Sequence, residues 1–324
     1  MTPLQTALGL VGYCKQADKA TPAANPAFAH GVSAGPIILT DIEQAQREVT
    51  GEQRIAHAAD RTGAPSGADF SCPAYPKSIG ALLHAVFGDI STSGAGPYVH
   101  VFAPGASLPY YTFWRSFLSE ITRLAGSKVD ELTLKWTGPK PIEVSVNGPG
   151  CSWAKDGALT FVPVVDDSLT ELVLTPVGGS MKVDVVGAAP ATLVVTAGEV
   201  KFSNGSEIIP DSTTIENGDV AEGLIEAAFS LTCVPEDLEM WQASVTGAVD
   251  GTAIDTDVLY GSLELNFIAG TDTLKVEAVR VPFVIAHPDL DPKNGAGKLE
   301  LAGIAYFDGT DSVAVTLTNT QATY

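Results

Sequence analysis

The side chains that could do chemistry in this 324-residue chain are scattered along its length. No two histidines have the spacing of metal ligands, and no two cysteines form a C-x-x-C pair. The pattern predicts four free thiols made in a reducing compartment, and a surface or half-buried position for His84. The residues concerned are His30, His57, His84, His100 and His287, and Cys14, Cys72, Cys151 and Cys233.

One segment partly matches a calcium loop. In DLDPKNGAGKLE (289–300), Asp289, Asp291 and Glu300 occupy positions 1, 3 and 12 of an EF-hand-like loop. Lys293 stands at position 5 and Asn294 where the loop needs glycine, and strand-like runs replace the flanking helices. A long loop with an Asn-Gly turn is the better interpretation, so the sequence predicts no metal site here.

Motifs for phosphate binding and nucleophilic catalysis are also missing. STSGAGPY (91–98) has no lysine, and NGAGK (294–298) lacks the earlier glycine and the Ser/Thr of a phosphate loop, so both are interpreted as hairpin loops. Neither G-x-S-x-G nor H-E-x-x-H occurs. The acids at Asp166, Asp167 and PEDLE (235–239) have no companion pocket signal and are interpreted as solvated. We therefore expect no enzyme, no cofactor and no metal.

Charge and hydropathy narrow the class of protein further. The formal net charge is −20, which argues against a surface that grips nucleic acid or anionic lipid. The N-terminal residues do not resemble a secretory signal, and no apolar window reaches the ~18–20 residues of a membrane span. The sequence predicts a soluble protein made in the cytoplasm.

Short alternating segments fenced by glycine and proline dominate the chain, from YVHVF (98–102) to SVAVTLTN (312–319). This pattern predicts a mainly β protein with two tandem antiparallel β-sandwich or barrel domains, each with one flanking α-helix. Residues 1–66 are interpreted as an N-terminal arm and long loop that packs with the first domain and has little core of its own. The expected domains are 67–190, in which 151–190 could be an insertion, and 191–324.

The strongest internal signal is a helix-like cassette that occurs twice. FSCPAYPKSIGALLHAVFG (70–88) and FSLTCVPEDLEMWQASVTG (229–247) align without a gap at a spacing of 229 − 70 = 159 residues. Each has a proline before an apolar stripe and a glycine where a left-handed cap belongs. The positions that define the repeat are Phe70, Pro76, Ile79, Leu82, Val86 and Gly88, and Phe229, Pro235, Leu238, Trp241, Val245 and Gly247.

Weaker matches follow the cassette at shifted spacing. Residues 99–105 resemble 263–270, residues 110–115 resemble 275–280, and residues 128–136 resemble 298–306. We interpret the whole as an internal duplication. The alternative is two unrelated β-domains that each use a capped helix.

The order of motifs in the first half resembles that of phage major tail tube proteins. The run is IGALLHAVFGD, YVHVFAP, LPYYTFW, GSKVDELTLKW and IEVSVNG, with Tyr110 where the family commonly has serine and Ser127 where it commonly has cysteine. The second half resembles the family through EVKFSN, the cassette, SLELNF and a closing strand ending LTN. The resemblance covers roughly residues 1–150 and 195–320.

This resemblance implies a structural virion protein without catalytic activity. Family members build a hollow tail tube from stacked rings through which DNA is ejected, on a fold related to the ring proteins of type VI secretion tubes. Single-domain members form hexamers, so a two-domain chain would form a trimer with pseudo-sixfold symmetry. The implied partners are further copies of the chain and the tape measure, distal tail and terminator proteins, in a virion tail assembled in the host cytoplasm.

Two other functions remain open from the sequence. One is a distal-tail or tail-terminator ring protein, which would cap such a tube. The other is a carbohydrate-binding β-sandwich surface protein, against which the missing signal peptide and the lack of clustered aromatics argue. On the tube hypothesis, residues 31–66 would order on a neighbouring ring, and acidic side chains would line the lumen so that DNA slides without binding.

Overall fold

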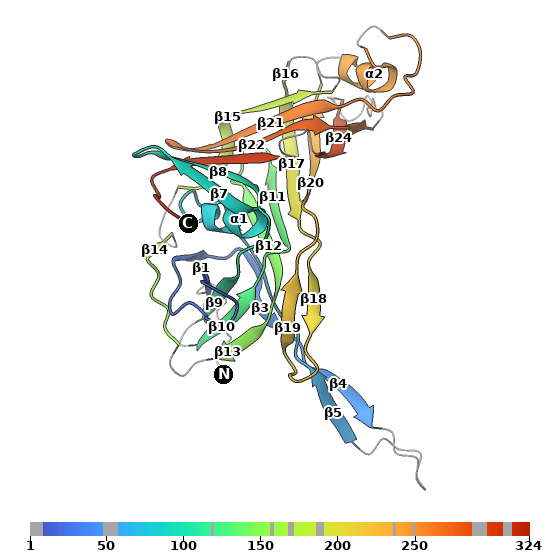
Figure 1. Ribbon diagram of the computed structural model, residues 1–324. Coiled ribbons are helices and arrows are strands. Elements are labelled where there is room, and N and C mark those ends of the chain that lie inside the picture. Colours follow the sequence, from blue (N-terminus) through green and yellow to red (C-terminus); the bar gives the residue numbers. More distant parts are fainter. Residues whose placement is uncertain are drawn as a thin grey trace, which may run out of the picture.

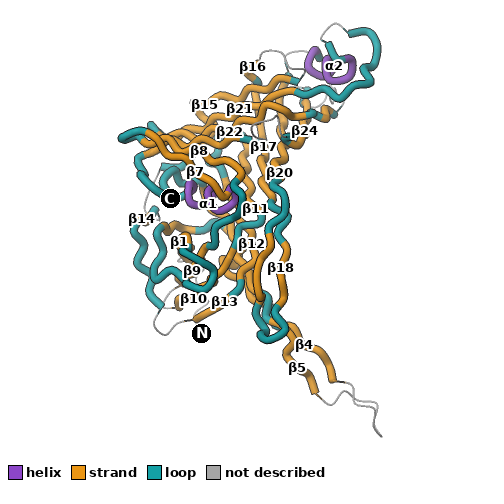
Figure 2. Tube along the Cα trace, in the orientation of Figure 1, coloured by secondary structure: helices purple, strands orange, loops and turns teal. Residues whose placement is uncertain are grey.

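The computed structural model describes residues 9–47, 58–117, 120–155, 159–167, 172–185, 191–235, 238–248, 251–286, 297–306 and 313–324. Within these ranges the chain is mainly β, as the sequence predicts, with three large sheets, two separate hairpins and two helices. Figure 2 shows how strands dominate the trace.

The largest sheet has eight strands and runs through the whole molecule (Figure 1). In spatial order its strands are β23 (Val284–Ile285), β24 (Leu299–Ile304), β20 (Glu226–Val234), β17 (Val194–Ser203), β11 (Glu131–Thr137), β12 (Glu143–Gly150), β6 (Ser66–Pro73) and β3 (Ala34–Thr40). Side chains on its central strands alternate between buried and solvent-facing, so one face is core and the other is wet.

Two further sheets cover the core face of the eight-stranded sheet. The six-stranded sheet has the order β13 (Ser152–Lys155), β10 (Glu120–Ser127), β9 (Tyr111–Phe117), β1 (Gly9–Lys15), β2 (Phe28–Gly31) and β14 (Val165–Asp166). The seven-stranded sheet has the order β16 (Ala191–Thr192), β15 (Thr175–Asp184), β21 (Gly261–Ala269), β22 (Asp272–Val281), β25 (Ala314–Asn319), β8 (Tyr98–Pro104) and β7 (Gly88–Ser93). One continuous cluster of buried side chains joins all three sheets.

Strand order repeats between the two halves of the chain. The order β13-β10-β9-β1-β2 in one sheet corresponds to β25-β22-β21-β15-β16 in another, taken in chain order. In the eight-stranded sheet, β3-β6-β12-β11 corresponds in the same way to β17-β20-β24-β23. Every neighbouring pair in both sets is antiparallel. Strand β14 and the hairpin β7–β8 have no counterpart among the strands that the structure describes.

This order differs from the weaker sequence matches that follow the cassette. Those matches set β8 against β21, β9 against β22 and β11 against β24, whereas the sheets place β9 where β21 lies and β12 where β24 lies. The hairpin β7–β8 explains the difference, because it adds strands between the helix and β9 in the first half only. The sequence matches and the strand order of the sheets therefore pair different strands of the two halves.

The N-terminal region is only partly an arm. The expectation that residues 1–66 carry little core is wrong for 9–40, where β1, β2 and β3 pair into two of the large sheets and Val11 and Tyr13 are fully buried. The sequence of this region shows no alternating pattern, because its apolar residues stand in short groups among Ala, Gly and Pro. These residues form strands because β1 pairs with β9 and β3 pairs with β6. The hairpin of β4 (Glu43–Arg47) and β5 (Ala58–Gly63) does project from the body (Figure 1).

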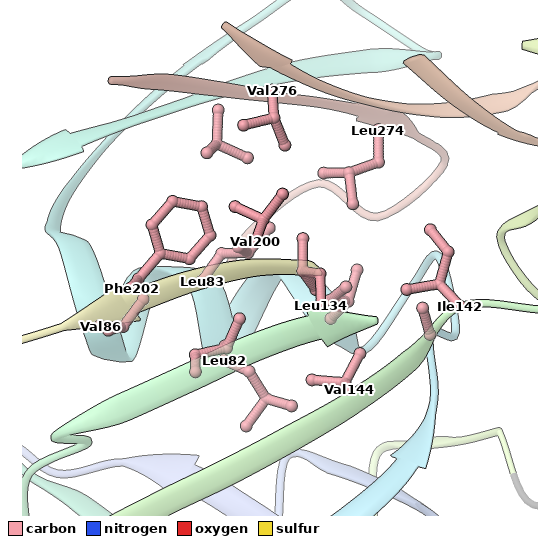
Figure 3. Packing of buried hydrophobic residues seen from close by; sticks show 14 of the residues in the cluster. Leu82, Leu83, Val86, Leu134, Ile142, Val144, Val200, Phe202, Leu274 and Val276 are labelled. Atoms are coloured by element: carbon pink, nitrogen blue, oxygen red, sulfur yellow. The ribbon is translucent and has the colours of Figure 1, made fainter. Parts of the chain in front are cut away.

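Helix α1 (Ile79–Phe87) is buried on every side. Its sequence predicts one apolar face, yet all nine residues are buried. Figure 3 shows Leu82, Leu83 and Val86 among side chains of β11, β12, β17 and β22. The helix is enclosed because it lies where the three sheets meet.

Helix α2 (Glu239–Thr246) has only one buried residue, Ala243, and lies at the far end of the molecule (Figure 1). The cassette positions of Gly80 and Leu83 are Glu239 and Gln242 here. The two copies of the cassette therefore have the same ends but different surroundings.

Candidate functional surface

The two halves place the repeat-defining residues at corresponding points. Phe70 on β6 and Phe229 on β20 are both buried. Pro76 and Pro235 precede the helices, while Gly88 and Gly247 end them with φ angles of 87° and 76°. A positive φ suits glycine, and each cap N–H donates to the helix carbonyl four residues earlier. Ile79, Leu82 and Val86 are buried, whereas Leu238, Trp241 and Val245 are half-buried.

The structure brings one cysteine and one histidine together, which the sequence did not indicate. Cys72 Sγ lies 3.8 Å from His30 Nε2, and that nitrogen also lies 3.1 Å from Tyr13 Oη. Both side chains are essentially inaccessible. Burial lowers the pKa of His30 to about 4 and raises the pKa of the Cys72 thiol well above its usual value. Near neutral pH neither group ionises, so the pair is part of the core.

Two sequence expectations about titratable groups are corrected. His84, expected at or near the surface, is buried within α1, and its pKa is lowered to about 4, first by desolvation. Asp167, expected to be solvated, is 4% exposed, and burial raises the pKa of its carboxyl. Both side chains are buried by segments that are distant in the sequence, so the local sequence does not indicate their burial. Asp289 and Asp291 of the calcium-like loop lie outside the described residues.

The four cysteines are free, as predicted. Among the residues that the structure describes, no three His, Cys, Asp or Glu side chains converge as metal ligands do. A pocket lies between the bases of the two projecting hairpins, lined by Leu39, Pro65, Pro149 and Ile208 among others, with Asp41 as its one acidic residue. Its other polar side chains are Ser66, Asn147 and Ser206, and its lining includes no histidine, cysteine, lysine or arginine.

The wet face of the eight-stranded sheet is the most distinctive surface. Its central strands β6, β12, β11, β17, β20 and β24 present small hydroxyl residues and charges outward. Serine and threonine form neighbouring rungs, as where Ser71 Oγ lies 2.8 Å from Ser145 Oγ and Thr133 lies opposite Ser145. The described residues of this face include no arginine and no aromatic side chain on these six strands.

Acidic groups outnumber basic groups on this face. The described outward-facing charges of these strands are Asp69, Glu131, Glu143, Glu199, Glu226 and Glu300 against Lys135 and Lys201. Both lysines pair within the face: Lys201 Nζ lies 2.6 Å from Glu131 Oε2, and Lys135 Nζ lies 3.4 Å from Glu199 Oε2. The hydrogen bond with Glu131 raises the pKa of Lys201, which keeps the lysine protonated. The face therefore carries net negative charge.

The seven-stranded sheet has a different outer surface. Lys182 and Lys275 both pair with Glu264, and Lys275 also pairs with Glu277. These charges balance one another on adjacent strands, and the two lysines hold the pKa of Glu264 below its usual value. Of these two sheet surfaces, only the outer face of the eight-stranded sheet carries an excess of acidic groups among its described residues.

Two hairpins extend from the same end of the eight-stranded sheet (Figure 1). The hairpin of β18 (Glu207–Pro210) and β19 (Asn217–Ala221) connects β17 to β20, just as β4–β5 connects β3 to β6. The β18–β19 hairpin is anchored to the body of the protein through Asp219. Lys19 Nζ lies 3.3 Å from Asp219 Oδ2, and Tyr110 Oη donates a hydrogen bond to the same carboxylate. Next to it, Lys128 pairs with Glu222.

The protein is thus mainly β, and its distinctive features are the acidic face of the eight-stranded sheet and the outermost strands of that sheet. The family model described as "Phage tail tube protein" matches residues 6–321. The chain therefore belongs to the phage tail tube protein family, a class of structural proteins of the virion tail. A search of curated proteins gave no match. No helix in the described part of the chain is long and apolar enough to cross a membrane.

Proposed function

We propose that this chain is a tail tube subunit that assembles with copies of itself into stacked rings, and that the resulting tube conducts DNA at ejection without catalysis. The observation that carries the proposal is the eight-stranded sheet, which has one buried face and one acidic and hydroxyl-rich face, and whose two outermost strands have no further neighbour among the described strands. Ring assembly gives such edges a partner, because a neighbouring subunit can continue the sheet.

The acidic face of the eight-stranded sheet is the proposed lumen wall. DNA binding to proteins depends on cations that neutralise phosphates and release counterions. Both lysines of the described face are already paired with carboxylates, and arginine is missing there. The surface would therefore repel DNA and let it slide.

The repeated strand order supports an internal duplication. On this proposal the first tail-tube unit comprises the strands within 9–155 and the second those within 175–319, with the boundary near residue 170 instead of 190. Strand β15 favours the change because it pairs with β21 in the seven-stranded sheet. Two units per chain would allow a trimeric ring to imitate sixfold symmetry.

The proposed partners are further copies of the chain and the proteins at the two ends and inside the tube: distal tail, terminator and tape measure proteins. The proposed location is the virion tail, after assembly in the host cytoplasm. A distal-tail or terminator ring is the alternative within the same class, and it differs in forming single rings that do not stack.

Electron microscopy of the purified chain tests the proposal. At high protein concentration we expect rings or tubes of uniform diameter, and native mass spectrometry of an isolated ring should give three copies. Rings that never stack would favour the terminator alternative, and six copies would overturn the trimer. A chain that stays monomeric at every concentration would overturn the tube function itself.

A further inference from the structure

The middle of the eight-stranded sheet shows how two units of this fold join. Strand β11, at the end of the order β3-β6-β12-β11, pairs with β17, at the start of the order β17-β20-β24-β23. The pairing is antiparallel and runs from Glu131 opposite Ser203 to Thr137 opposite Ala197. A first unit and a second unit thus meet head to tail within one chain.

The two outermost strands of the sheet correspond to the two strands that pair at this middle junction. Strand β3 begins the first unit and β23 ends the second, and among the strands that the structure describes neither has a further neighbour in the eight-stranded sheet. By strand order, β3 corresponds to β17 and β23 corresponds to β11. The chain therefore carries one edge of each kind that its own middle junction uses.

The residue pairs between neighbouring strands show which residue of β23 corresponds to which residue of β11. In the first unit Ser71 lies opposite Ser145, which lies opposite Thr133. In the second unit Ser230, the cassette partner of Ser71, lies opposite Ala302, which lies opposite Val284. Val284 therefore occupies the position of Thr133.

The β3 side follows by the same reasoning. Ala228 lies opposite Lys201 on β17. Asp69, one residue before the cassette as Ala228 is, lies opposite Ile37 on β3. Ile37 therefore occupies the position of Lys201. Because Thr133 and Lys201 face each other within the chain, Val284 of one copy and Ile37 of another are the matching pair.

Side-chain chemistry at these edges fits burial by another subunit. Val284 is 73% exposed, and Leu39 on β3 is 44% exposed. At the paired junction inside the chain, the positions of Val284 and Leu39 are the half-buried polar residues Thr133 and Ser203. Apolar side chains at an open edge gain more from being covered than polar ones do.

We propose that strand β23 of one copy pairs antiparallel with strand β3 of a second copy, with Val284 opposite Ile37, so that the ring interface repeats the junction of the two units within the chain. This inference rests on the proposed function.

A double variant with Leu39→Cys and Val284→Cys tests the pairing. In the proposed register these two positions on neighbouring copies are diagonal neighbours, about 7–8 Å apart. A short bismaleimide should link them between chains and give covalent oligomers up to the ring size on a denaturing gel. Three native cysteines are buried and Cys14 is half-buried. Treating the unaltered chain with the same bismaleimide measures how much linking these native cysteines give.

The matched control combines Val284→Cys with Leu224→Cys, a 93% exposed position outside both edges. Linking of the first variant well above this control supports the inference. If the first variant forms rings by microscopy but links no better than the control, the inference is overturned while the tube function stands. If the unaltered chain forms no rings at all, the proposed function fails instead.

A second measurement covers the case in which the double cysteine variant does not fold. Val284→Pro blocks one edge and Leu39→Pro blocks the other, because proline at an edge hinders pairing with a further strand, so neither variant alone should form rings. Mixed at equal amounts, each variant retains the edge that the other lacks, and we expect a one-to-one heterodimer by native mass spectrometry. Normal rings from Val284→Pro alone would contradict the proposal.

Discussion

Phe87 of α1 and Phe202 of β17 pack edge to face, with their ring centroids 4.9 Å apart and both side chains buried. The contact joins the helix of the first half to a strand of the second. Close by, Asn204 Nδ2 donates to the carbonyls of Val86 and Val129, each at 3.0 Å. The two halves are thus held by one shared core.

Replacing Phe202 by alanine should lower the free energy of unfolding by about 3–5 kcal/mol, because a large buried ring leaves a cavity. Since the core is shared, we expect a single cooperative transition in urea, seen alike by tryptophan fluorescence and far-UV circular dichroism. Val194→Ala on the same strand is the control, because that side chain is 66% exposed. Two separate transitions, only one of them shifted, would contradict the shared core.

Gly80 in α1 lies directly beneath the ring of Tyr324, and a Cβ at position 80 would overlap that ring. Glycine to alanine in a helix normally stabilises by roughly 0.5–1 kcal/mol. Here Gly80→Ala should instead destabilise, by about 1–3 kcal/mol, because the core is overpacked. A double-mutant cycle with Tyr324→Ala checks the cause. Additive effects of the two substitutions would exclude the overlap as the reason.

Acid should destabilise the protein through His30. Its pKa is lowered to about 4 in the fold, first by burial, against 6.5 for the free side chain. A histidine with a lowered pKa stabilises the fold fully above pH 6.5, and this contribution is lost as the pH falls toward 4. The loss amounts to about 3 kcal/mol, since one pKa unit corresponds to about 1.4 kcal/mol.

Urea unfolding between pH 7 and pH 4 measures this dependence. His30→Gln should flatten it. Asp167 acts in the opposite sense, because burial raises the pKa of its carboxyl and acid removes that penalty. Asp167→Asn should therefore steepen the loss on acidification. An unchanged pH profile in His30→Gln would show that other groups, such as His84, dominate.

Removing the β4–β5 hairpin should impair stacking and spare folding. Its ends are already close, because the Asp41 N–H donates to the Pro65 carbonyl at 3.1 Å. Replacing residues 43–63 by two glycines should leave rings intact and shorten tubes, as measured by microscopy. Deleting 31–66 removes β3 and should give insoluble protein. Full-length tubes from the shorter deletion would exclude a stacking role for the hairpin.

Charge reversal on the eight-stranded face should make assembled tubes retain DNA. A triple variant Glu143→Lys, Glu226→Lys and Glu300→Lys places cations where phosphates would pass, so duplex DNA should bind in a salt-dependent way. The control carries the same number of reversals elsewhere, at Glu207, Glu239 and Asp257, which are exposed in the chain. Equal DNA retention by both variants would contradict a lumen lined by this face.

The sequence determined the class of fold, the family and the repeated cassette, because these depend on local patterns. Alternating short strands fenced by glycine and proline show a mainly β chain, and the glycines at 88 and 247 end helices through a local backbone preference. Free cysteines follow equally from their wide spacing.

Only the tertiary structure decided what depends on pairing across long sequence distances. It placed β1 and β3 in the core, buried α1 on all sides while leaving α2 exposed, and brought Cys72 to His30. It also gathered the acids of six strands on one face and set the ends of the eight-stranded sheet at β23 and β3. A strand's neighbour is fixed by the closing of distant loops around a shared core, and local sequence carries no record of that choice.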